Sequence, residues 1–342
     1  MSLPEKKQRF VHMVSCLVLA LCLLLSGCVR EQPGGQISET RLLLDTFCTI
    51  TIHGAVDSGL SVLLDEAFTL CADYEALFSI TIEGSDVWRI NHAAGEPVEV
   101  DIQTIEVINA GIEFGVLSDG MFDITIGRLS RLWDFGEAMI SLSNPSDEEL
   151  DEARQTVDFR QVQVAGNTVR LNNPDAWIDL GAVAKGYIGD KIAGLLLERG
   201  ASGALINLGG DVIAVGSRQD GSPWRIAVRN PFGDSDEYLG VIEATGVSVI
   251  SSGIYERQFE KDGIIYHHIL NPNTGMPVIS DVVSATVITE NAMLGEGLST
   301  IAVLAGSEGA REIFRDAHGF IGAVLILEDG EMLMLGDIRL YD

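Results

Sequence analysis

The sequence predicts an α+β fold, with mixed sheets and packed helices in a single bilobed body. Segments with helical spacing and segments with strand-like alternation are interspersed, but they follow no regular βαβ repeat. Hydrophobic residues make up 46% of the 342 residues and charged residues 21%, which is ordinary for a globular protein and excludes disorder over most of the chain. No long Pro- or Ser-rich linker interrupts residues 41–342, so we expect them to form one domain.

The first half of this body reads as a strand followed by helices. Residues 42–52 alternate as a strand does, and residues 58–78 place apolar side chains on one helical face. A second helix is expected over residues 104–117. Ser146, with Glu149 three positions later, is typical of a capping box and predicts a third helix that ends near residue 156.

The second half combines hairpins with helices. Residues 177–180 are strand-like, and residues 182–199 are expected to form a helix that ends at Gly200. The other predicted elements are hairpins around residues 165–167, 262–263 and 329–330, a strand over residues 204–215 that is broken at Gly209-Gly210, and helices over residues 291–305 and 308–316.

The N-terminus has the features of an export signal. Lys6, Lys7 and Arg9 precede a short apolar run at residues 14–25, which suits a signal peptide better than a membrane-spanning helix. The run ends in Leu-Ser-Gly-Cys, which looks like the lipobox of bacterial lipoproteins; the alternative is an uncleaved anchor with a chance cysteine. We expect a lipoprotein signal peptide over residues 1–27, a lipidated Cys28 that opens a flexible tether over residues 28–40, and export to the extracytoplasmic face of a bacterial membrane.

Charge and cysteine content exclude two classes of site. The formal net charge of -28 makes nucleic acid an unsuitable partner, because phosphate binding depends on clustered positive charge. Cys48 lies in a strand-like run and Cys71 in a helical pattern, so we expect two buried thiols rather than a disulfide. Structural zinc has no ligands here, since no CxxC or Cys/His spacing occurs.

Two stretches could handle phosphate and protons. The usual P-loop and GxGxxG signatures are absent. Asp179-Leu180-Gly181-Ala182 runs from a strand into a helix start that carries Lys185, which favours a bound anion, although a helix start with a solvated lysine is the simpler interpretation. His267 and His268 precede an Asn-Pro-Asn-Thr-Gly turn, where an imidazole could transfer a proton or be merely structural.

Two further stretches carry candidate ligands. Met121-Phe122-Asp123 follows a Ser-Asp-Gly turn, and its simplest interpretation is a turn with a buried Phe. Glu296 and Thr300 are four residues apart in a predicted helix, so both oxygens lie on one face and suit Mg²⁺, although such pairs also arise by chance. Taken singly, none of these four stretches decides a function.

Taken together and in this order, the motifs resemble those of the ApbE family, the FAD:protein FMN transferases. The resemblance runs from about Leu42 to the C-terminus. It is carried by LLLDTFCTITIHG (42–54), FSITIEGSDVWRINHAAGEPVEVD (78–101), SDGMFDITIGRLSRLWDFG (118–136), IDLGAVAKGYIGD (178–190), LINLGGD (205–211), SSGIYER (251–257), HHILNPNTGMPV (267–278) and GEGLSTIAVLAG (295–306).

The resemblance implies a role for each matching residue. Glu296, Thr300 and the Ala182 carbonyl would hold Mg²⁺, and His268 would be the catalytic residue. FAD, as the substrate, would contact Leu44, Thr81, Met121, Phe122, Asp123, Asp179, Lys185 and Ile269.

The chain departs from the family pattern at three of these positions. Glu296 stands where the family usually has Asp, and Thr81 stands where it often has an aromatic residue against the flavin dinucleotide. The usual Met-Gly-Thr is Leu44-Asp45-Thr46.

The implied activity is Mg²⁺-dependent transfer of the FMN moiety of FAD onto a Thr or Ser hydroxyl, with release of AMP. The acceptor would be an exported or membrane flavoprotein with an Asp-x-x-Ser/Thr-Gly-Ala-Ser/Thr motif; this chain has no such stretch, so we do not expect it to modify itself. Three alternatives remain open: an FAD pyrophosphatase that gives FMN and AMP, a flavin-binding lipoprotein without catalysis, and a lipoprotein that binds an unrelated solute.

Overall fold

A computed structural model describes residues 30–32, 35–54, 59–141, 143–234 and 236–342. The predicted signal peptide and the predicted lipidation at Cys28 lie outside the described residues. Within those ranges no helix combines the length and the apolar character that crossing a membrane requires.

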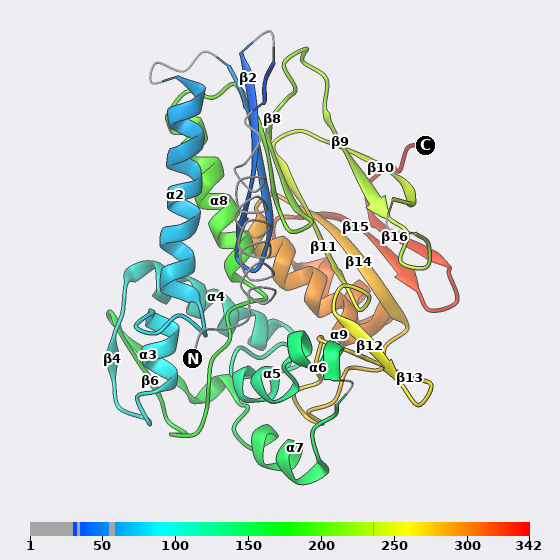
Figure 1. Cartoon of the computed structure of the whole chain (residues 1–342). Helices are drawn as coiled ribbons and strands as arrows, with labels where there is room; N and C mark the ends of the chain where they lie inside the picture. Colours follow the sequence, from blue (N-terminus) through cyan, green and yellow to red (C-terminus); the bar gives the residue numbers. More distant parts are fainter. Residues whose placement is uncertain (1–29, 33–34, 55–58, 142, 235) are drawn as a thin grey trace, which may run out of the picture.

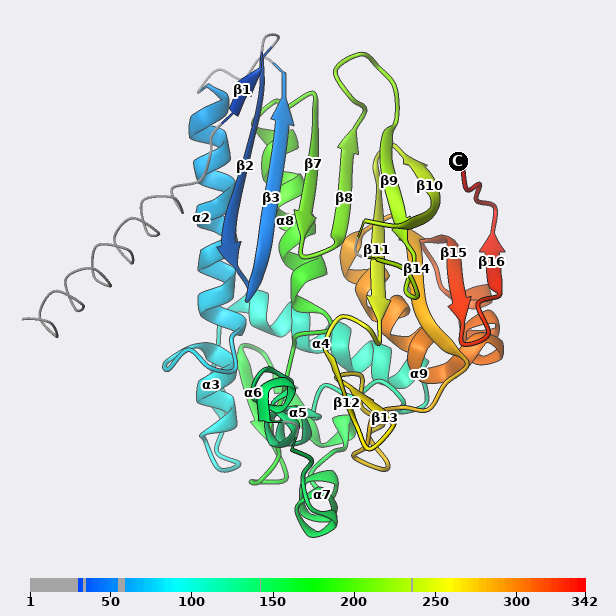
Figure 2. The same cartoon turned by 45° about the vertical axis from the view of Figure 1, so that its right-hand side comes forward.

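The centre of the molecule is a nine-stranded sheet whose strand order follows the chain (Figure 2). Every neighbouring pair of these strands is antiparallel. The strands are β1 (Arg30–Gln32), β2 (Gln36–Leu43), β3 (Thr46–His53), β7 (Gly203–Leu208), β8 (Asp211–Gly216), β11 (Val247–Gly253), β14 (Val282–Thr289), β15 (Phe320–Leu327) and β16 (Met332–Gly336).

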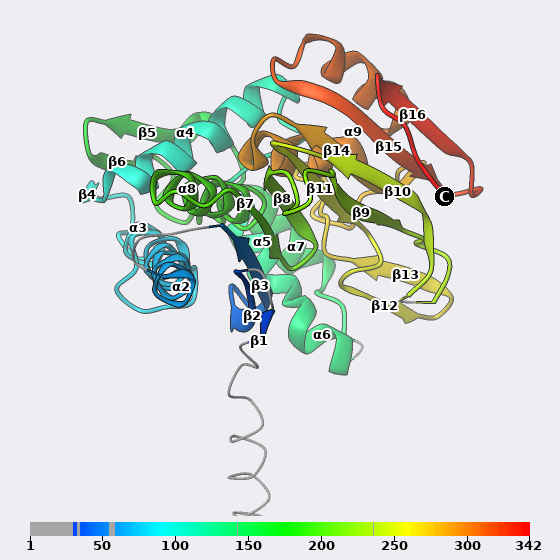
Figure 3. The ribbon, with the colours of Figure 1, turned by 90° about the horizontal axis from the view of Figure 1, so that it is seen from above.

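The two faces of this sheet are covered differently (Figure 3). Three long helices pack on one face: α2 (Leu60–Phe78), α8 (Ala184–Glu198) and α9 (Ala292–Asp316). A hairpin of β9 (Trp224–Arg229) and β10 (Tyr238–Ala244) covers the other face over β8, β11 and β14, where Trp224 and Ile226 pack against Val212 and Val249.

The remaining elements lie together beyond one end of the large sheet (Figure 1). They are α3 (Asp86–Asn91), α4 (Ile102–Leu117), α5 (Gly127–Trp133), α6 (Phe135–Ser141), α7 (Asp147–Arg154), the 3-10 helix η1 (Phe159–Gln161), β4 (Val98–Glu99), β5 (Val162–Ala165), β6 (Thr168–Leu171), β12 (Gln258–Lys261) and β13 (Ile264–His267). One cluster of buried residues joins both parts, since it includes Ile50 and Ile206 of the large sheet as well as Ile108 of α4. The chain is therefore a single body.

The predicted α+β class is confirmed, and most predicted elements are present. The capping box of Ser146 and Glu149 starts α7, and the turns at Gly209-Gly210, Asp262-Gly263 and Asp329-Gly330 each join two paired strands. A mixed sheet was expected, but the described strand pairs are all antiparallel. Each connection between neighbouring strands returns to the same end of the sheet, so the next strand runs in the opposite direction. The strand predicted at residues 177–180 is absent from the described elements. In its place, Trp177 forms an isolated parallel bridge with Ile126.

Two predicted boundaries differ from the structure. The strand expected over residues 42–52 is interrupted by a hairpin turn at Leu44-Asp45, where both residues have a φ of 55°. The two helices expected over residues 291–305 and 308–316 form α9, which is broken at Gly306 (φ 72°, ψ 177°). Periodicity alone cannot locate a turn that lacks glycine, and this explains the first difference.

The flexible tether predicted over residues 28–40 is wrong for residues 30–32, which form β1, and for residues 36–40, which belong to β2. Ile37 is 3% exposed and packs in the main core, and Ser38 and Thr40 make hydroxyl hydrogen bonds of 2.7 and 2.8 Å across to Thr51 and Thr49. Because these residues are polar, their alternation with one buried isoleucine was too weak a signal for a strand.

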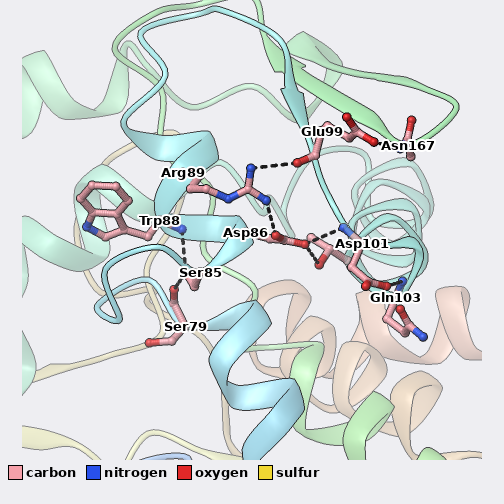
Figure 4. Close-up of polar contacts among 10 residues, drawn as sticks. Ser79, Ser85, Asp86, Trp88, Arg89, Glu99, Asp101, Gln103 and Asn167 are labelled. Atoms are coloured by element: carbon pink, nitrogen blue, oxygen red, sulfur yellow. Dashed lines mark hydrogen bonds and ion pairs between the residues drawn. The ribbon is translucent and has the colours of Figure 1, made fainter.

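The connection between α2 and α4 is held by a buried carboxylate (Figure 4). Asp86 Oδ2 accepts hydrogen bonds from Asp101 N and Thr104 Oγ1, both at 2.7 Å, while its Oδ1 pairs with Arg89. The Ser85 hydroxyl caps α3 by accepting from Trp88 N at 2.9 Å. This network fixes the segment that follows α2 and carries the exposed Thr81.

Candidate active site

Lys185 lies at the centre of a charged cluster that three distant segments bring together. Its side chain starts from the first turn of α8, and its ammonium forms an ion pair with Glu296 of α9. The same ammonium lies 3.0 Å from Oδ2 of Asp211, the first residue of β8. The side chains of Glu296 and Asp211 are 3% and 5% exposed, whereas that of Lys185 is 29% exposed, so two buried carboxylates lie against a partly exposed lysine side chain.

The packing of α8 against α9 sets this arrangement. Gly186 N donates to Glu296 Oε2 at 2.6 Å, and a Cβ on Gly186 would lie 2.5 Å from the carbonyl oxygen of Ala292. Asp190, one turn later, accepts from the first amides of α9, Ala292 N at 2.7 Å and Met293 N at 3.0 Å. A carboxylate suits the positive end of a helix, so Asp190 fixes the start of α9 and with it the position of Glu296.

Burial and mutual charge shift the pKa values of this cluster. Burial lowers the pKa of Lys185, but the carboxylates of Asp211 and Glu296 outweigh it and raise the pKa above the ordinary value for lysine. Burial raises the pKa of Glu296, and Asp211 adds to this effect while Lys185 opposes it. Two buried carboxyl groups thus share one ammonium.

The predicted metal ligands fit Mg²⁺ held partly by substrate. Thr300 lies one turn after Glu296, and its hydroxyl is 3.3 Å from Ser252 Oγ, which also lies 2.8 Å from Ser299 Oγ. Ala182 lies in the turn before α8. In the described part of the chain no three His, Cys, Asp or Glu side chains gather to hold a metal. A site of one or two carboxylates, completed by water and phosphate oxygens, is the usual one for Mg²⁺.

His268 directly follows β13, and its pKa lies below the ordinary value for histidine, so its imidazole is neutral at neutral pH. Burial is the main cause that lowers its pKa to about 4, with smaller contributions from Arg257, His267 and Lys185. Its backbone N donates to the Arg257 carbonyl at 3.1 Å, while its Nδ1 has no hydrogen-bond partner among the described residues. The neighbouring His267 instead donates from Nε2 to the Val278 carbonyl at 3.1 Å, which indicates a structural role. Nδ1 of His267 likewise has no hydrogen-bond partner among the described residues, so the role of His268 in proton transfer stays a prediction.

The other predicted FAD contacts lie in different settings. Asp179 Oδ1 accepts from Gly181 N at 2.9 Å, and this bond shapes the turn before α8. Leu44 N donates to Glu75 Oε1 at 2.9 Å, which ties the β2–β3 turn to α2. Ile269 is 6% exposed, next to His268, and packs with the core under α9.

Phe122 and Asp123 already have partners within the protein. Phe122 is 4% exposed and packs edge-on against Phe114, with ring centroids 5.5 Å apart, while Met121 before it is half-buried. Asp123 Oδ1 accepts from Thr125 N at 2.7 Å and Thr125 Oγ1 at 2.6 Å, and its Oδ2 accepts from Phe159 N at 2.8 Å. These contacts show structural roles; contact of Met121, Phe122 and Asp123 with FAD stays a prediction.

Asp211 is the residue of this site that sequence reasoning missed. It ends the stretch LINLGGD, whose two glycines form the β7–β8 turn. A carboxylate immediately after such a turn could have been noticed as a candidate, but its partner Lys185 lies in another element.

Comparison with known proteins decides the family. The sequence model of the ApbE family matches residues 44–325. This chain belongs to the ApbE family. The match includes every predicted site residue apart from Cys28, and it spans all the segments that meet at Lys185.

Curated relatives and solved structures of the ApbE family agree with this assignment. A Vibrio cholerae protein named FAD:protein FMN transferase is 33% identical over 85% of this chain and 87% of its own length. One from Treponema pallidum with the same name is 30% identical over 92% of this chain and 91% of its own. The crystal structure of the ApbE protein of Thermotoga maritima has a TM-score of 0.80 at 33% identity, covering 88% of this chain and 97% of its own. The flavin transferase ApbE of Vibrio cholerae has a TM-score of 0.80 at 28% identity, covering 89% and 98%.

Proposed function

We propose that this chain is an Mg²⁺-dependent transferase that moves the FMN moiety of FAD onto a Thr or Ser hydroxyl of an acceptor protein and releases AMP. Membership of the ApbE family supports the flavin transferase class. The observation that carries the finer proposal is the cluster of Lys185, Glu296 and Asp211, because it combines a cation for phosphate with carboxylates for a metal.

The reaction exchanges one phosphorus–oxygen bond for another. The acceptor hydroxyl oxygen attacks the FMN phosphorus, the bond from that phosphorus to the bridging oxygen breaks, and AMP leaves with the bridging oxygen. His268 is neutral and accepts the proton of the hydroxyl. Lys185 and the start of α8 bind the pyrophosphate oxygens, since an ammonium and free helix amides both favour anions.

Mg²⁺ would be held by Glu296, Thr300 and the Ala182 carbonyl, where it would neutralise charge that develops on the phosphate oxygens. Asp190 and Gly186 position Glu296 for this role through the contacts between α8 and α9. Glu296 is one methylene longer than the usual Asp, and its two hydrogen-bonded oxygens show that the longer side chain is held in place.

We further propose that the protein works outside the cytoplasm, anchored by lipid at Cys28, on acceptors with an Asp-x-x-Ser/Thr-Gly-Ala-Ser/Thr motif. The support is the order of basic residues, apolar run and Leu-Ser-Gly-Cys at the N-terminus. Palmitate labelling in a bacterial host, with Cys28→Ala as the control, tests the anchor: label on both chains would contradict it.

Mass spectrometry of an acceptor peptide tests the activity. The purified chain is incubated with FAD, Mg²⁺ and a peptide that carries Asp-x-x-Thr-Gly-Ala-Thr, and AMP is followed in parallel with an EDTA control. We expect covalent FMN on the peptide and an equal amount of AMP, both lost with EDTA. AMP without modified peptide would instead show an FAD pyrophosphatase, and neither product would show a flavin-binding protein without catalysis.

A further inference from the structure

The Lys185 ammonium occupies the position at which the carboxylates could receive a metal. It pairs with Glu296 Oε1 and lies 3.0 Å from Asp211 Oδ2, and both carboxylates are almost fully buried. Glu296 Oε2 is held separately by the backbone amide of Gly186 at 2.6 Å. The carboxylate of Glu296 is thus fixed by main chain, while its other partner is the end of a flexible four-carbon side chain.

We propose that Lys185 is a movable counter-ion that competes with the divalent cation for Glu296 and Asp211. This inference rests on the proposed metal role of Glu296, and it adds Asp211 to the metal site. An ammonium and a divalent cation repel each other strongly at contact distance, so the two cannot share the carboxylates.

The partial exposure of the Lys185 side chain leaves room for it to move. The side chain as a whole is 29% exposed, against 3% for that of Glu296, so its four-carbon chain can rotate toward solvent while the carboxylates stay buried. A free ammonium on that side faces the space in which the pyrophosphate is expected at the start of α8. The same outward movement of Lys185 would free the carboxylates for the metal and the ammonium for phosphate. Binding of the metal and binding of phosphate should therefore favour each other.

Binding of Mn²⁺, followed by calorimetry and by loss of its electron paramagnetic resonance signal, tests the competition. The full chain is compared with Lys185→Met, which keeps the length of the side chain and removes the charge. We expect Lys185→Met to bind Mn²⁺ at least about tenfold more tightly, because no cation has to be displaced. Lys191→Met is the matched control on the same helix; Lys191 pairs with Glu106 at 3.1 Å, away from Glu296, and its loss should leave Mn²⁺ affinity unchanged. Equal or weaker Mn²⁺ binding in Lys185→Met would overturn the proposal.

A measurement on the unaltered chain covers the case in which Lys185→Met fails to fold. The side-chain nitrogen of a lysine held by carboxylates gives a distinct NMR signal, assigned here by its loss in Lys185→Arg. Titration with Mg²⁺ should shift this signal and leave that of Lys191 in place; an unmoved signal during Mg²⁺ binding would overturn the proposal. Failure of the transferase is separable, because the peptide assay would then give no FMN transfer whatever the Mn²⁺ affinities.

Discussion

At the scale of single residues, one histidine has an environment that sets its protonation. Burial lowers the pKa of His268 to about 4, so the imidazole stays neutral well below the ordinary pKa of 6.5. A base with a lowered pKa keeps its function down to that pKa and loses it only as the pH falls through it.

Titration of His268 should therefore leave the rate of FMN transfer constant between pH 7 and pH 5. The rate should fall as the pH drops through the His268 pKa of about 4. Replacement of His268 with Ala should slow transfer by roughly 10²- to 10⁴-fold at pH 7 and remove this limb of the profile. Single-turnover rates of FMN transfer to the acceptor peptide, measured across this pH range for both proteins, check the pH profile and the effect of the substitution. His318 is exposed, so His318→Ala serves as the control. An unchanged rate in His268→Ala would contradict the assignment.

Asp123 allows its structural role to be separated from its predicted contact with FAD. Both carboxylate oxygens accept hydrogen bonds, so Asp123→Asn would turn an amide donor toward either Phe159 N or Thr125 N. We expect a loss of about 1–3 kcal/mol in the free energy of unfolding, measured by urea denaturation. Asp119→Asn, at an exposed turn, should lower the free energy of unfolding much less. If Asp123→Asn instead left stability unchanged and weakened only FAD binding, the carboxylate would serve the substrate alone.

At the scale of elements, the crossing of α8 and α9 carries the site. Both helices contribute one charged residue of the Lys185–Glu296 pair, and the two meet where Gly186 has no side chain. A Cβ there would lie 2.5 Å from Ala292 O and 2.6 Å from Met293 Cα, which is closer than atoms can pack.

Gly186→Ala should therefore force the helices apart. We expect a loss of about 1–3 kcal/mol in the free energy of unfolding, as for an overpacked core, together with loss of FMN transfer. Gly194→Ala is the matched control within α8, because no atom lies within 4 Å of its Cβ position. This change should increase the free energy of unfolding by at most about 1 kcal/mol. Thermal or urea unfolding of both variants, alongside the peptide assay, makes the comparison. Full activity in a folded Gly186→Ala protein would show that the crossing tolerates more space.

The elements were predictable where the signal was local, and the site was predictable only through the resemblance. The Ser146 capping box and the glycine turns at residues 209–210 and 262–263 are short patterns with a direct physical cause, and the structure contains them. The turn at Leu44-Asp45 has no glycine, and β2 has a single fully buried apolar residue, so periodicity misread both. Asp211 was missed because pairing with Lys185 depends on how β8 and α8 pack, and no spacing along the chain encodes that contact.

At the scale of the whole molecule, the N-terminal strands complete the edge of the large sheet. Deletion of residues 1–40 would remove β1 and most of β2, uncover the backbone edge of β3 and take away the buried Ile37. We expect the protein without residues 1–40 to unfold at a clearly lower temperature than the full chain and to aggregate. Deletion of residues 1–29 should leave the unfolding temperature unchanged. Thermal unfolding and size-exclusion chromatography distinguish the two; equal stability would mean that β2 contributes little to the body.

The order of the large sheet also bears on how the chain folds after export. Because spatial order follows chain order and neighbours are antiparallel, each new strand can add to the edge of those already formed as the chain emerges, N-terminus first, on the outer side of the membrane. Lys185 and Asp211 then come into place early, but Glu296 lies 111 residues after Lys185 and arrives only with α9. We expect a partly emerged chain to present a sheet without a functioning site, so that FAD binding begins only when export is nearly finished.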